Sequence, residues 1–198
     1  MVTKGVQTKQ KIITKSLHLF SVKGYYNTSI NDILSATNLT KGGLYGHFHS
    51  KEDIWYAVYD QAVAIWKDIV FKDIRKIDDP LKRIEKALAN DLKNYLGADV
   101  FKGGCFFLNM LVELSGQSST MSDHVLKGMI GFSEVITRWL KEAHDKNMLK
   151  SGINVNEIAK FIIVSINGCA ALYPSTRDPK IWKLTLTQIN YYINELKK

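Results

Sequence analysis

Residues 24–53 have the sequence GYYNTSINDILSATNLTKGGLYGHFHSKED, and this stretch decides how the N-terminal region folds. Thr28 or Ser29 can cap a short helix, because a side-chain hydroxyl accepts a hydrogen bond from the free backbone N–H groups at a helix start. Asn38 then suits a tight turn, since asparagine tolerates the left-handed conformation. Thr40 can cap a further short helix. The stretch therefore predicts two short helices separated by a tight turn.

A longer helix is predicted on each side of this stretch. Before it, Ile13, Leu17 and Phe20 are spaced so that they share one helical face, and Gly24 marks the end of that helix. After it, Ser50 opens a long helix whose first turn holds acidic residues, which the positive end of the helix dipole favours. A supporting helix followed by a helix-turn-helix pair is the arrangement of many DNA-binding domains.

The rest of the chain also has helical periodicity and no alternating strand pattern, so the whole chain is expected to be all-α. Pro174 and Pro179 predict a loop between the last two helices. The helix before that loop is apolar almost all round, which indicates burial on more than one side. The further helices are expected over about residues 80–96, 106–114, 122–146, 156–172 and 182–196.

The last helix carries an apolar seam with spacings of three and four residues, which is typical of helices that pack against a partner helix. The alternative is that this seam belongs to the core of its own subunit. The seam consists of Trp182, Leu186, Ile189, Ile193 and Leu196.

Positive charge is concentrated at the N-terminal end of the chain. The whole chain has a formal net charge of +8, and residues 1–51 contain seven lysines against a single acid, Asp32. A basic end on a near-neutral body suits a partner with a phosphate backbone. A lysine-rich tail that serves solubility is the alternative.

Cysteine content and hydropathy bear on the location of the protein. Cys105 and Cys169 are too few for a disulfide framework, so reduced thiols in the cytoplasm are expected. The N-terminus is polar where a signal peptide needs an apolar stretch. The apolar run 161–173 is interrupted by polar residues and is too short to span a bilayer. We therefore expect a cytoplasmic protein without a membrane partner.

The sequence contains no recognisable enzyme motif. It has no Gly-x-Ser-x-Gly elbow, phosphate-binding loop or metal-ligand cluster, and Gly131-Phe132-Ser133-Glu134 lacks the second glycine. We expect neither catalysis nor a cofactor or metal. A helical module that only binds a ligand or a protein is the remaining alternative, but such a module has no need for the concentrated basic charge.

A family resemblance is carried by residues between about positions 10 and 55. They are Gly24-Tyr25-Tyr26-Asn27-Thr28-Ser29-Ile30, Ile33, Ala36, Leu39-Thr40-Lys41-Gly42-Gly43-Leu44-Tyr45-Gly46-His47-Phe48 and Ser50-Lys51-Glu52-Asp53. In order and spacing this pattern resembles the tetracycline-repressor (TetR) family of transcriptional regulators. The chain departs from the family pattern at Leu34 and Thr37, where alanine is usual, and at Asn38, where glycine is usual. Gly43 gives the recognition helix an additional glycine, which weakens it.

The resemblance implies a plan for the whole protein. It implies an N-terminal three-helix helix-turn-helix DNA-binding domain, residues 1–52, joined by a long helix to a C-terminal helical domain, residues 53–198, for ligand binding and dimerisation. It further implies a repressor that binds a palindromic operator in double-stranded DNA as a homodimer through its last two helices. A small-molecule or electrophile effector would release this repressor from its operator.

The physical pattern and the resemblance together give a set of candidate DNA contacts. Lys41 is the best candidate for a base contact, through guanine O6 and N7 in the major groove. Tyr45 and His47 resemble the family's phosphate-contacting positions, and Lys51 adds a charged phosphate contact. Hydroxyls and free N–H groups at the start of the second helix can hold a further phosphate. The full set is Thr28, Ser29, Thr40, Lys41, Gly42, Gly43, Tyr45, His47 and Lys51.

An apolar effector pocket is expected in the C-terminal domain, although a stripe of methionine and aromatic residues also suits a plain core. Cys105 lies at a predicted helix start, which lowers the pKa of a thiol and raises its reactivity toward electrophiles. A reactive thiol is the alternative at this position, and a small buried residue is the favoured interpretation. The candidate lining residues are Cys105, Phe106, Met110, Met129, Phe132 and Trp139.

Overall fold

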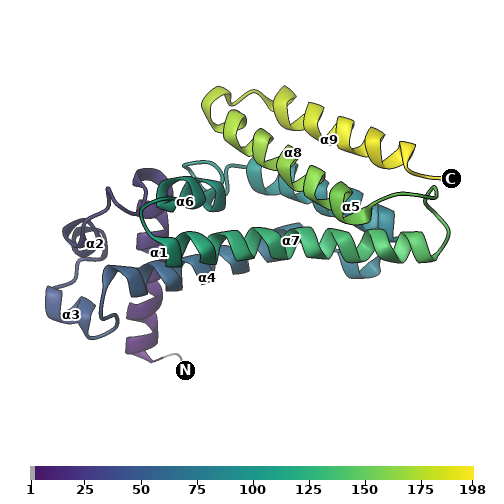
Figure 1. The fold of residues 1–198 in the computed structure, drawn as a ribbon. Coiled ribbons are helices and arrows are strands. Elements are labelled where there is room, and N and C mark those ends of the chain that lie inside the picture. Colours follow the sequence, from purple (N-terminus) through teal and green to yellow (C-terminus); the bar gives the residue numbers. More distant parts are fainter. Residues whose placement is uncertain (1–2) are drawn as a thin grey trace.

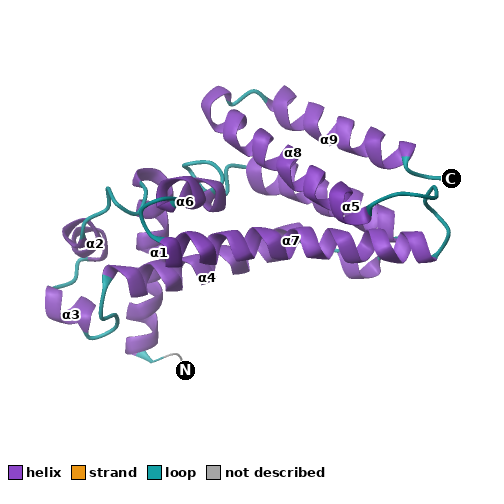
Figure 2. Ribbon diagram, viewed as in Figure 1, coloured by secondary structure: helices purple, strands orange, loops and turns teal. Residues whose placement is uncertain are grey.

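The computed structural model describes residues 3–198, and within that range every regular element is helical, as Figure 2 shows. The first two residues of the predicted N-terminal domain lie outside the described range. The elements are α1 (Lys4–Lys23), α2 (Ile30–Thr37), α3 (Lys41–Tyr45), α4 (Lys51–Val70), η1 (Ile74–Lys76), α5 (Pro80–Ala89), η2 (Asn90–Leu96), α6 (Phe106–Leu114), α7 (Ser119–Asp145), α8 (Val155–Thr176) and α9 (Pro179–Glu195).

The N-terminal helices lie at one end of the molecule. Figure 1 shows α2 and α3 at that end and the C-terminus at the opposite end. Helix α1 packs against both α2 and α4, while α7 packs against α5, α6 and α8, and α9 lies on α8. The division between domains after residue 52 stays a prediction, because α4 runs through this position as one unbroken helix.

The local signals at the N-terminal helices are confirmed. Ser29 caps α2, and its hydroxyl accepts a hydrogen bond from the backbone N–H of Asp32. Asn38 ends α2 in the left-handed conformation, with a φ of 55°. Thr40 caps α3 by accepting a hydrogen bond from the backbone N–H of Gly43 at 3.2 Å. Side chains within a few residues therefore determine where α2 ends and where α3 begins.

The helix predicted over residues 80–96 is divided in two. Its second part, η2, is a π-helix that begins at Asn90. The Asn90 side-chain amide donates hydrogen bonds to the backbone carbonyls of Val70 and Lys72, at 3.0 and 3.2 Å, and so holds η2 against the end of α4. Short π-helical segments are frequent at functional sites, and η2 forms part of a cavity wall described below.

The loop predicted from Pro174 to Pro179 is present but shorter than expected, since only Arg177 and Asp178 lie between the last two helices. Helix α8 continues through Pro174 to Thr176, and Pro179 is the first residue of α9. Pro174 lies in the last turn of α8, where its missing N–H removes only one hydrogen bond from the helix. Its ring lies against Gly104, where a Cβ atom would come within 2.5 Å of the proline Cγ. The absence of a side chain at Gly104 therefore makes room for the proline ring.

The apolar seam of the last helix packs inside its own chain. This agrees with the alternative that the seam belongs to the core of its own subunit. Ile189 and Ile193 are only 3% and 0% exposed within a single chain, so the assignment of these residues to a partner helix is wrong. A different set of apolar side chains on α8 and α9 remains exposed. This set, called the outer apolar face below, consists of Phe161, Val164, Leu172, Leu184 and Tyr191.

Helix α8 has 22 residues and is long and apolar enough to cross a membrane, judged by length and composition alone. It is longer than the apolar run 161–173, which by itself is too short to span a bilayer. Because α8 packs against both α7 and α9, and core helices meet the same criterion, this property is weak evidence for a membrane span.

Candidate nucleic-acid interface and ligand cavity

Helix α3 presents its first turn on the outside of the N-terminal helices. Leu44 is fully buried and Phe48 is 5% exposed, so these two side chains attach α3 to the core. Thr40 and Lys41 are exposed, and a Cβ atom at Gly42 would meet nothing within 4 Å. The backbone of this turn is therefore open to close approach by a large partner.

Tyr45 belongs to the same exposed surface. Its side chain is 45% exposed, so it does not form part of the core. Gly43 is half-buried, and a Cβ atom there would lie 3.4 Å from the Thr40 hydroxyl. His47 is also half-buried and lies near Gly5 at the start of α1. The structure thus brings the predicted contacts of α3 together on one surface, and their binding to DNA remains a prediction.

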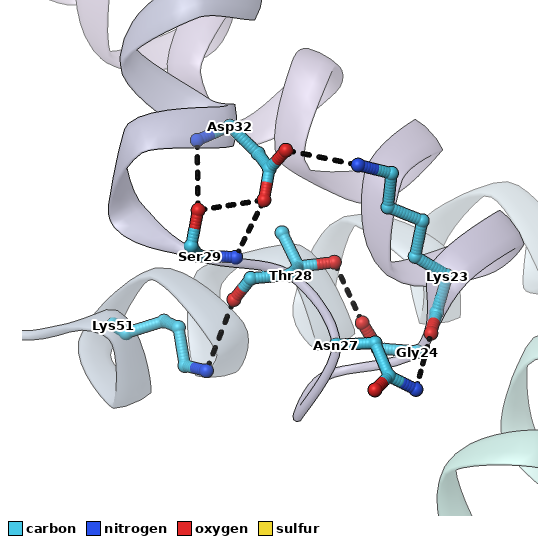
Figure 3. A network of polar contacts seen from close by, with 7 residues as sticks. All are labelled: Lys23, Gly24, Asn27, Thr28, Ser29, Asp32 and Lys51. Carbon is cyan, nitrogen blue, oxygen red and sulfur yellow. Dashed lines mark hydrogen bonds and ion pairs between the residues drawn. The ribbon is translucent and has the colours of Figure 1, made fainter.

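The prediction that the Thr28 hydroxyl contacts a phosphate is wrong. Thr28 is fully buried, and its hydroxyl donates a 2.7 Å hydrogen bond to the backbone carbonyl of Gly24 (Figure 3). This bond closes the turn between α1 and α2. The hydroxyl therefore serves the local structure and is not available to a partner.

The start of α2 already holds a negative group. The Asp32 carboxylate accepts hydrogen bonds from the Ser29 hydroxyl and backbone N–H, at 2.7 and 2.8 Å, and forms an ion pair with Lys23 at 2.9 Å (Figure 3). The Ser29 hydrogen bond and the Lys23 ammonium hold the pKa of Asp32 well below its ordinary value. A charged carboxylate thus occupies the donors that Ser29 was expected to offer to a phosphate, and only the exposure of Ser29 still favours a DNA contact.

Lys51 connects the start of α4 to the turn between α1 and α2. Its ammonium group donates hydrogen bonds to the backbone carbonyls of Tyr25 and Thr28, at 3.0 and 3.1 Å, and lies 4.2 Å from the centroid of the Tyr25 ring. Burial lowers the pKa of Lys51. Because a lysine has three N–H bonds, one remains for the predicted phosphate contact.

A carboxylate from α6 binds the same turn. Glu113 accepts hydrogen bonds from the backbone N–H groups of Tyr25 and Tyr26, at 2.9 and 2.8 Å, one on each oxygen atom. Gly24, with a φ of 83°, leaves room for this contact, since a Cβ atom there would lie 2.6 Å from the carboxylate. Sequence reasoning missed Glu113, because nothing near it signals a partner 88 residues away.

A cavity of about 540 Å³ lies between α4, η2, α7 and α8, beside the start of α6. Phe106 and Met110 are fully buried in the core and do not line the cavity, while Phe107 of the same helix does. Trp139 lines a neighbouring cleft, which shares Lys67 and Phe71 with the cavity. The predicted pocket residues that do line the cavity are Cys105, Met129 and Phe132.

The structure agrees with the interpretation of Cys105 as a small buried residue and disfavours the alternative of a reactive thiol. The residue is 8% exposed, and burial raises the pKa of its thiol to about 11. Backbone hydrogen bonds at the start of α6 act in the opposite direction but do not compensate for burial. At neutral pH the group is a protonated thiol, which is the less nucleophilic form.

A buried acid that sequence reasoning missed, Asp91, lies in the cavity wall. It belongs to η2 and is 9% exposed, and its Oδ1 atom accepts a 2.8 Å hydrogen bond from the indole N–H of Trp66. Burial raises the pKa of Asp91 from 3.8 to about 6, and the hydrogen bond from Trp66 offsets only part of that rise. A carboxylate that is charged at neutral pH in such a place is costly, and this combination is typical of functional groups.

The replacement Asp91→Asn is expected to stabilise the protein at neutral pH by about 2–3 kcal/mol. The amide keeps the shape of the side chain and the acceptor for Trp66, but it carries no charge. Because the folded pKa of about 6 lies above the ordinary value of 3.8, folding disfavours the charged form of Asp91. This cost is small below about pH 4, grows as the pH rises through about 6, and is complete above about pH 7.

Chemical denaturation of both proteins at about pH 7.5 and about pH 4.5 measures this effect. The advantage of the asparagine variant should fall to roughly one third at the lower pH. An equal advantage at the two pH values would show that the gain does not come from the charge of Asp91.

Both parts of the chain match known regulatory families. Residues 12–58 match the family described as bacterial regulatory proteins, tetR family. Residues 80–189 match the family described as tetracyclin repressor-like, C-terminal domain, and this match covers more than half of the chain. The two matches together include α3 and the cavity residues from Asp91 to Ala170, while the cavity residues of α4 and its end, from Tyr59 to Phe71, lie between the two matched ranges.

Individual relatives agree with these matches. An uncharacterized HTH-type transcriptional regulator in the lacX 3′ region of Lactococcus lactis subsp. lactis is 37% identical over 109 residues, which are 54% of this chain and 55% of that protein. The HTH-type transcriptional repressor DhaR of Mycobacterium sp. (strain GP1) is 26% identical over 164 residues, 81% of this chain and 79% of DhaR. The crystal structure of a TetR transcriptional regulator from Chloroflexus aurantiacus J-10-FL has a TM-score of 0.91 at 24% identity and covers 98% of both chains, which shows the fold.

Proposed function

Because the chain belongs to the TetR family and is a DNA-binding transcriptional regulator, we propose that it represses transcription by binding a palindromic operator as a homodimer. The observation that carries the proposal is the exposed first turn of α3. Lys41, the open backbone at Gly42 and the side chain of Tyr45 lie on one surface above the buried Leu44. The N-terminal part of a recognition helix enters the major groove in helix-turn-helix proteins. Repression is supported by the name of the relative DhaR.

Each residue of this surface has a proposed role. Lys41 contacts base edges, and Tyr45 and His47 contact phosphates on either side of the groove. Lys51 offers its remaining N–H to a further phosphate. The excess of lysine in residues 1–51 attracts the duplex over a longer range and makes binding sensitive to salt.

The homodimer is proposed to form through the outer apolar face of α8 and α9. The side chains of this face are between 50% and 69% exposed in a single chain. Exposed apolar side chains gathered on two neighbouring helices mark a surface that another protein covers. A second copy of the chain is the occupant that a palindromic operator requires, because two recognition helices about 34 Å apart contact successive major grooves.

The cavity is proposed to hold a small-molecule effector that weakens operator binding. Helix α6 links the two sites, because Cys105 and Phe107 at its start lie at the cavity and Glu113 near its end holds the turn between α1 and α2. In this mechanism α6 can lie in two alternative places relative to the cavity, and the ligand binds the protein more tightly when α6 lies in one of them. Binding would therefore shift the N-terminal helices and change the distance between the two recognition helices. We propose that the protein acts in this way in the cytoplasm and without catalysis.

Selection of bound sequences from a random pool of DNA duplexes tests the proposed function. The expected product is an inverted repeat whose half-sites are about one helical turn apart. Binding to the selected duplex should weaken steeply as the salt concentration rises. A stable monomer that shows no preference among duplexes at low salt would contradict the proposal.

Two variants of α3 distinguish base contacts from phosphate contacts. Lys41→Ala should relax the preference at one base pair of each half-site by about 1–3 kcal/mol. Tyr45→Phe should weaken binding to all duplexes by a similar factor, because it removes a hydroxyl that contacts the backbone. Repeating the selection with each variant measures both effects. An unchanged preference profile for Lys41→Ala would show that Lys41 does not contact a base.

A further inference from the structure

The cavity contains a buried acid whose hydrogen-bonding capacity is only partly used. Within residues 3–198, Trp66 is the only residue that donates a hydrogen bond to the Asp91 side chain. In the same range no lysine, arginine or histidine forms an ion pair with it. A buried carboxylate without a counter-charge costs free energy, and a bound cation would remove that cost.

Aromatic rings surround this part of the cavity. Trp66 lies edge-on to Phe132, with ring centroids 4.9 Å apart, and edge-on to Phe71 at 5.6 Å. Tyr59 and Phe107 form another edge-on pair at 5.7 Å, and all five side chains line the cavity. The faces of such rings attract cations, and their apolar area favours the burial of an apolar ligand.

The remaining charged residues of the cavity lie at its rim. Asp60, Lys67 and Lys127 are exposed, so water and salt screen their charges. His124 is half-buried and packs edge-on against Tyr59, with ring centroids 4.8 Å apart. The buried part of the cavity wall thus has the negative charge of Asp91 in apolar and aromatic surroundings.

We propose that the effector is an organic cation, an apolar molecule with a protonated amine whose ammonium group pairs with Asp91 beside the rings of Trp66 and Phe132. This inference rests on the proposed function, which makes the cavity the effector site. The ammonium group donates a charge-assisted hydrogen bond to the carboxylate while the apolar body fills the cavity. Asp91 repels an anionic ligand in the same place, and a neutral ligand leaves the buried charge uncompensated.

Three probes with the same phenylbutyl body test this proposal: phenylbutylamine, phenylbutanol and phenylpentanoate. They differ only in a cationic, neutral or anionic head group. Isothermal titration calorimetry measures the binding of each probe to the full chain at about pH 7.5. The amine should bind at least about tenfold more tightly than the alcohol or the carboxylate. Equal or tighter binding of the alcohol or carboxylate overturns the proposal, and so does the absence of amine binding up to about 1 mM.

Two variants locate the preference within the cavity. In Asp91→Asn the preference for the amine should fall to within about twofold, because the amide has no charge to pair. Asp60→Asn is the matched control, since it removes an exposed carboxylate from the rim of the same cavity. Loss of the preference in Asp60→Asn, or its retention in Asp91→Asn, would overturn the assignment to Asp91. The probe comparison in the unaltered protein depends on neither variant.

Duplex binding, measured on the same samples, separates this inference from the proposed function. Preferential amine binding by a protein that binds no duplex would overturn the proposed function and leave the ligand class standing. Specific duplex binding together with a cavity that does not distinguish the three head groups would overturn the ligand class alone. Release of the duplex by the amine, and by neither of the other probes, would support both.

Discussion

Replacing Glu113 by alanine is expected to lower the free energy of unfolding by about 3–4 kcal/mol and to loosen the N-terminal helices from α6. Glu113 holds the backbone N–H groups of Tyr25 and Tyr26 at 2.9 and 2.8 Å. A hydrogen bond to a charged acceptor contributes roughly 1.5–3 kcal/mol, and the variant loses two of them. Lys51 also loses the carboxylate that favours its charged form.

Urea denaturation followed by circular dichroism measures the loss of stability. Glu134→Ala is a suitable control, because Glu134 is an exposed glutamate on α7 and its replacement should change stability by less than about 0.5 kcal/mol. Similar losses in the two variants would show that Glu113 has no special role.

The same variant tests the link between the cavity and the recognition helix. If α6 acts on the N-terminal helices through Glu113, a cavity ligand should change the operator affinity of Glu113→Ala much less than that of the unaltered protein. Ligand binding itself should persist, since Glu113 does not line the cavity. An undiminished effect of the ligand on operator affinity would exclude Glu113 as the link.

The replacement Val164→Asp is expected to produce a monomer and to weaken operator binding at least a thousandfold, about 4 kcal/mol. Val164 is 69% exposed in a single chain and lies on the outer apolar face of α8. In the proposed homodimer, the aspartate would be buried without a partner in an apolar interface, which is strongly unfavourable. A monomer binds only one half-site and so loses most of its specific affinity.

Val112→Asp is the matched control for this variant. Val112 is also 69% exposed, but it lies on α6 and outside the face that α8 and α9 share. Analytical ultracentrifugation gives the mass of each species, and titration with the selected duplex gives its affinity. A dimeric Val164→Asp protein, or equal losses in the two variants, would show that the dimer forms elsewhere.

Local reasoning was sufficient for the helices that carry the candidate DNA interface. Ser29, Asn38, Thr40 and Ser50 act on backbone groups only a few residues away, and each has the role that its residue type predicts. The exposed position of Tyr45 also followed from the sequence, because Leu44 and Phe48 already fill the inner side of α3. Such short-range interactions hardly depend on the rest of the fold.

Local reasoning failed where distant segments pack against the residue. Thr28 has the position of an exposed helix start, but the turn between α1 and α2 folds over it and buries its hydroxyl. Pro174 was predicted to break a helix, but its ring packs on Gly104, seventy residues earlier in the chain. Cys105 lies at a helix start as predicted, and burial nevertheless raises the pKa of its thiol to about 11.

The sequence by itself determined where the helices of the N-terminal region begin and end, and to which family the chain is similar. Only the tertiary structure decided that Glu113 binds a turn 88 residues away and that Asp91 lies in an aromatic cavity beside Trp66. Helix caps act through bonds to nearby backbone atoms, so their effects can be inferred from adjacent residues. The environment of a carboxylate depends instead on which distant side chains exclude water from it, and the folded chain alone brings those side chains together.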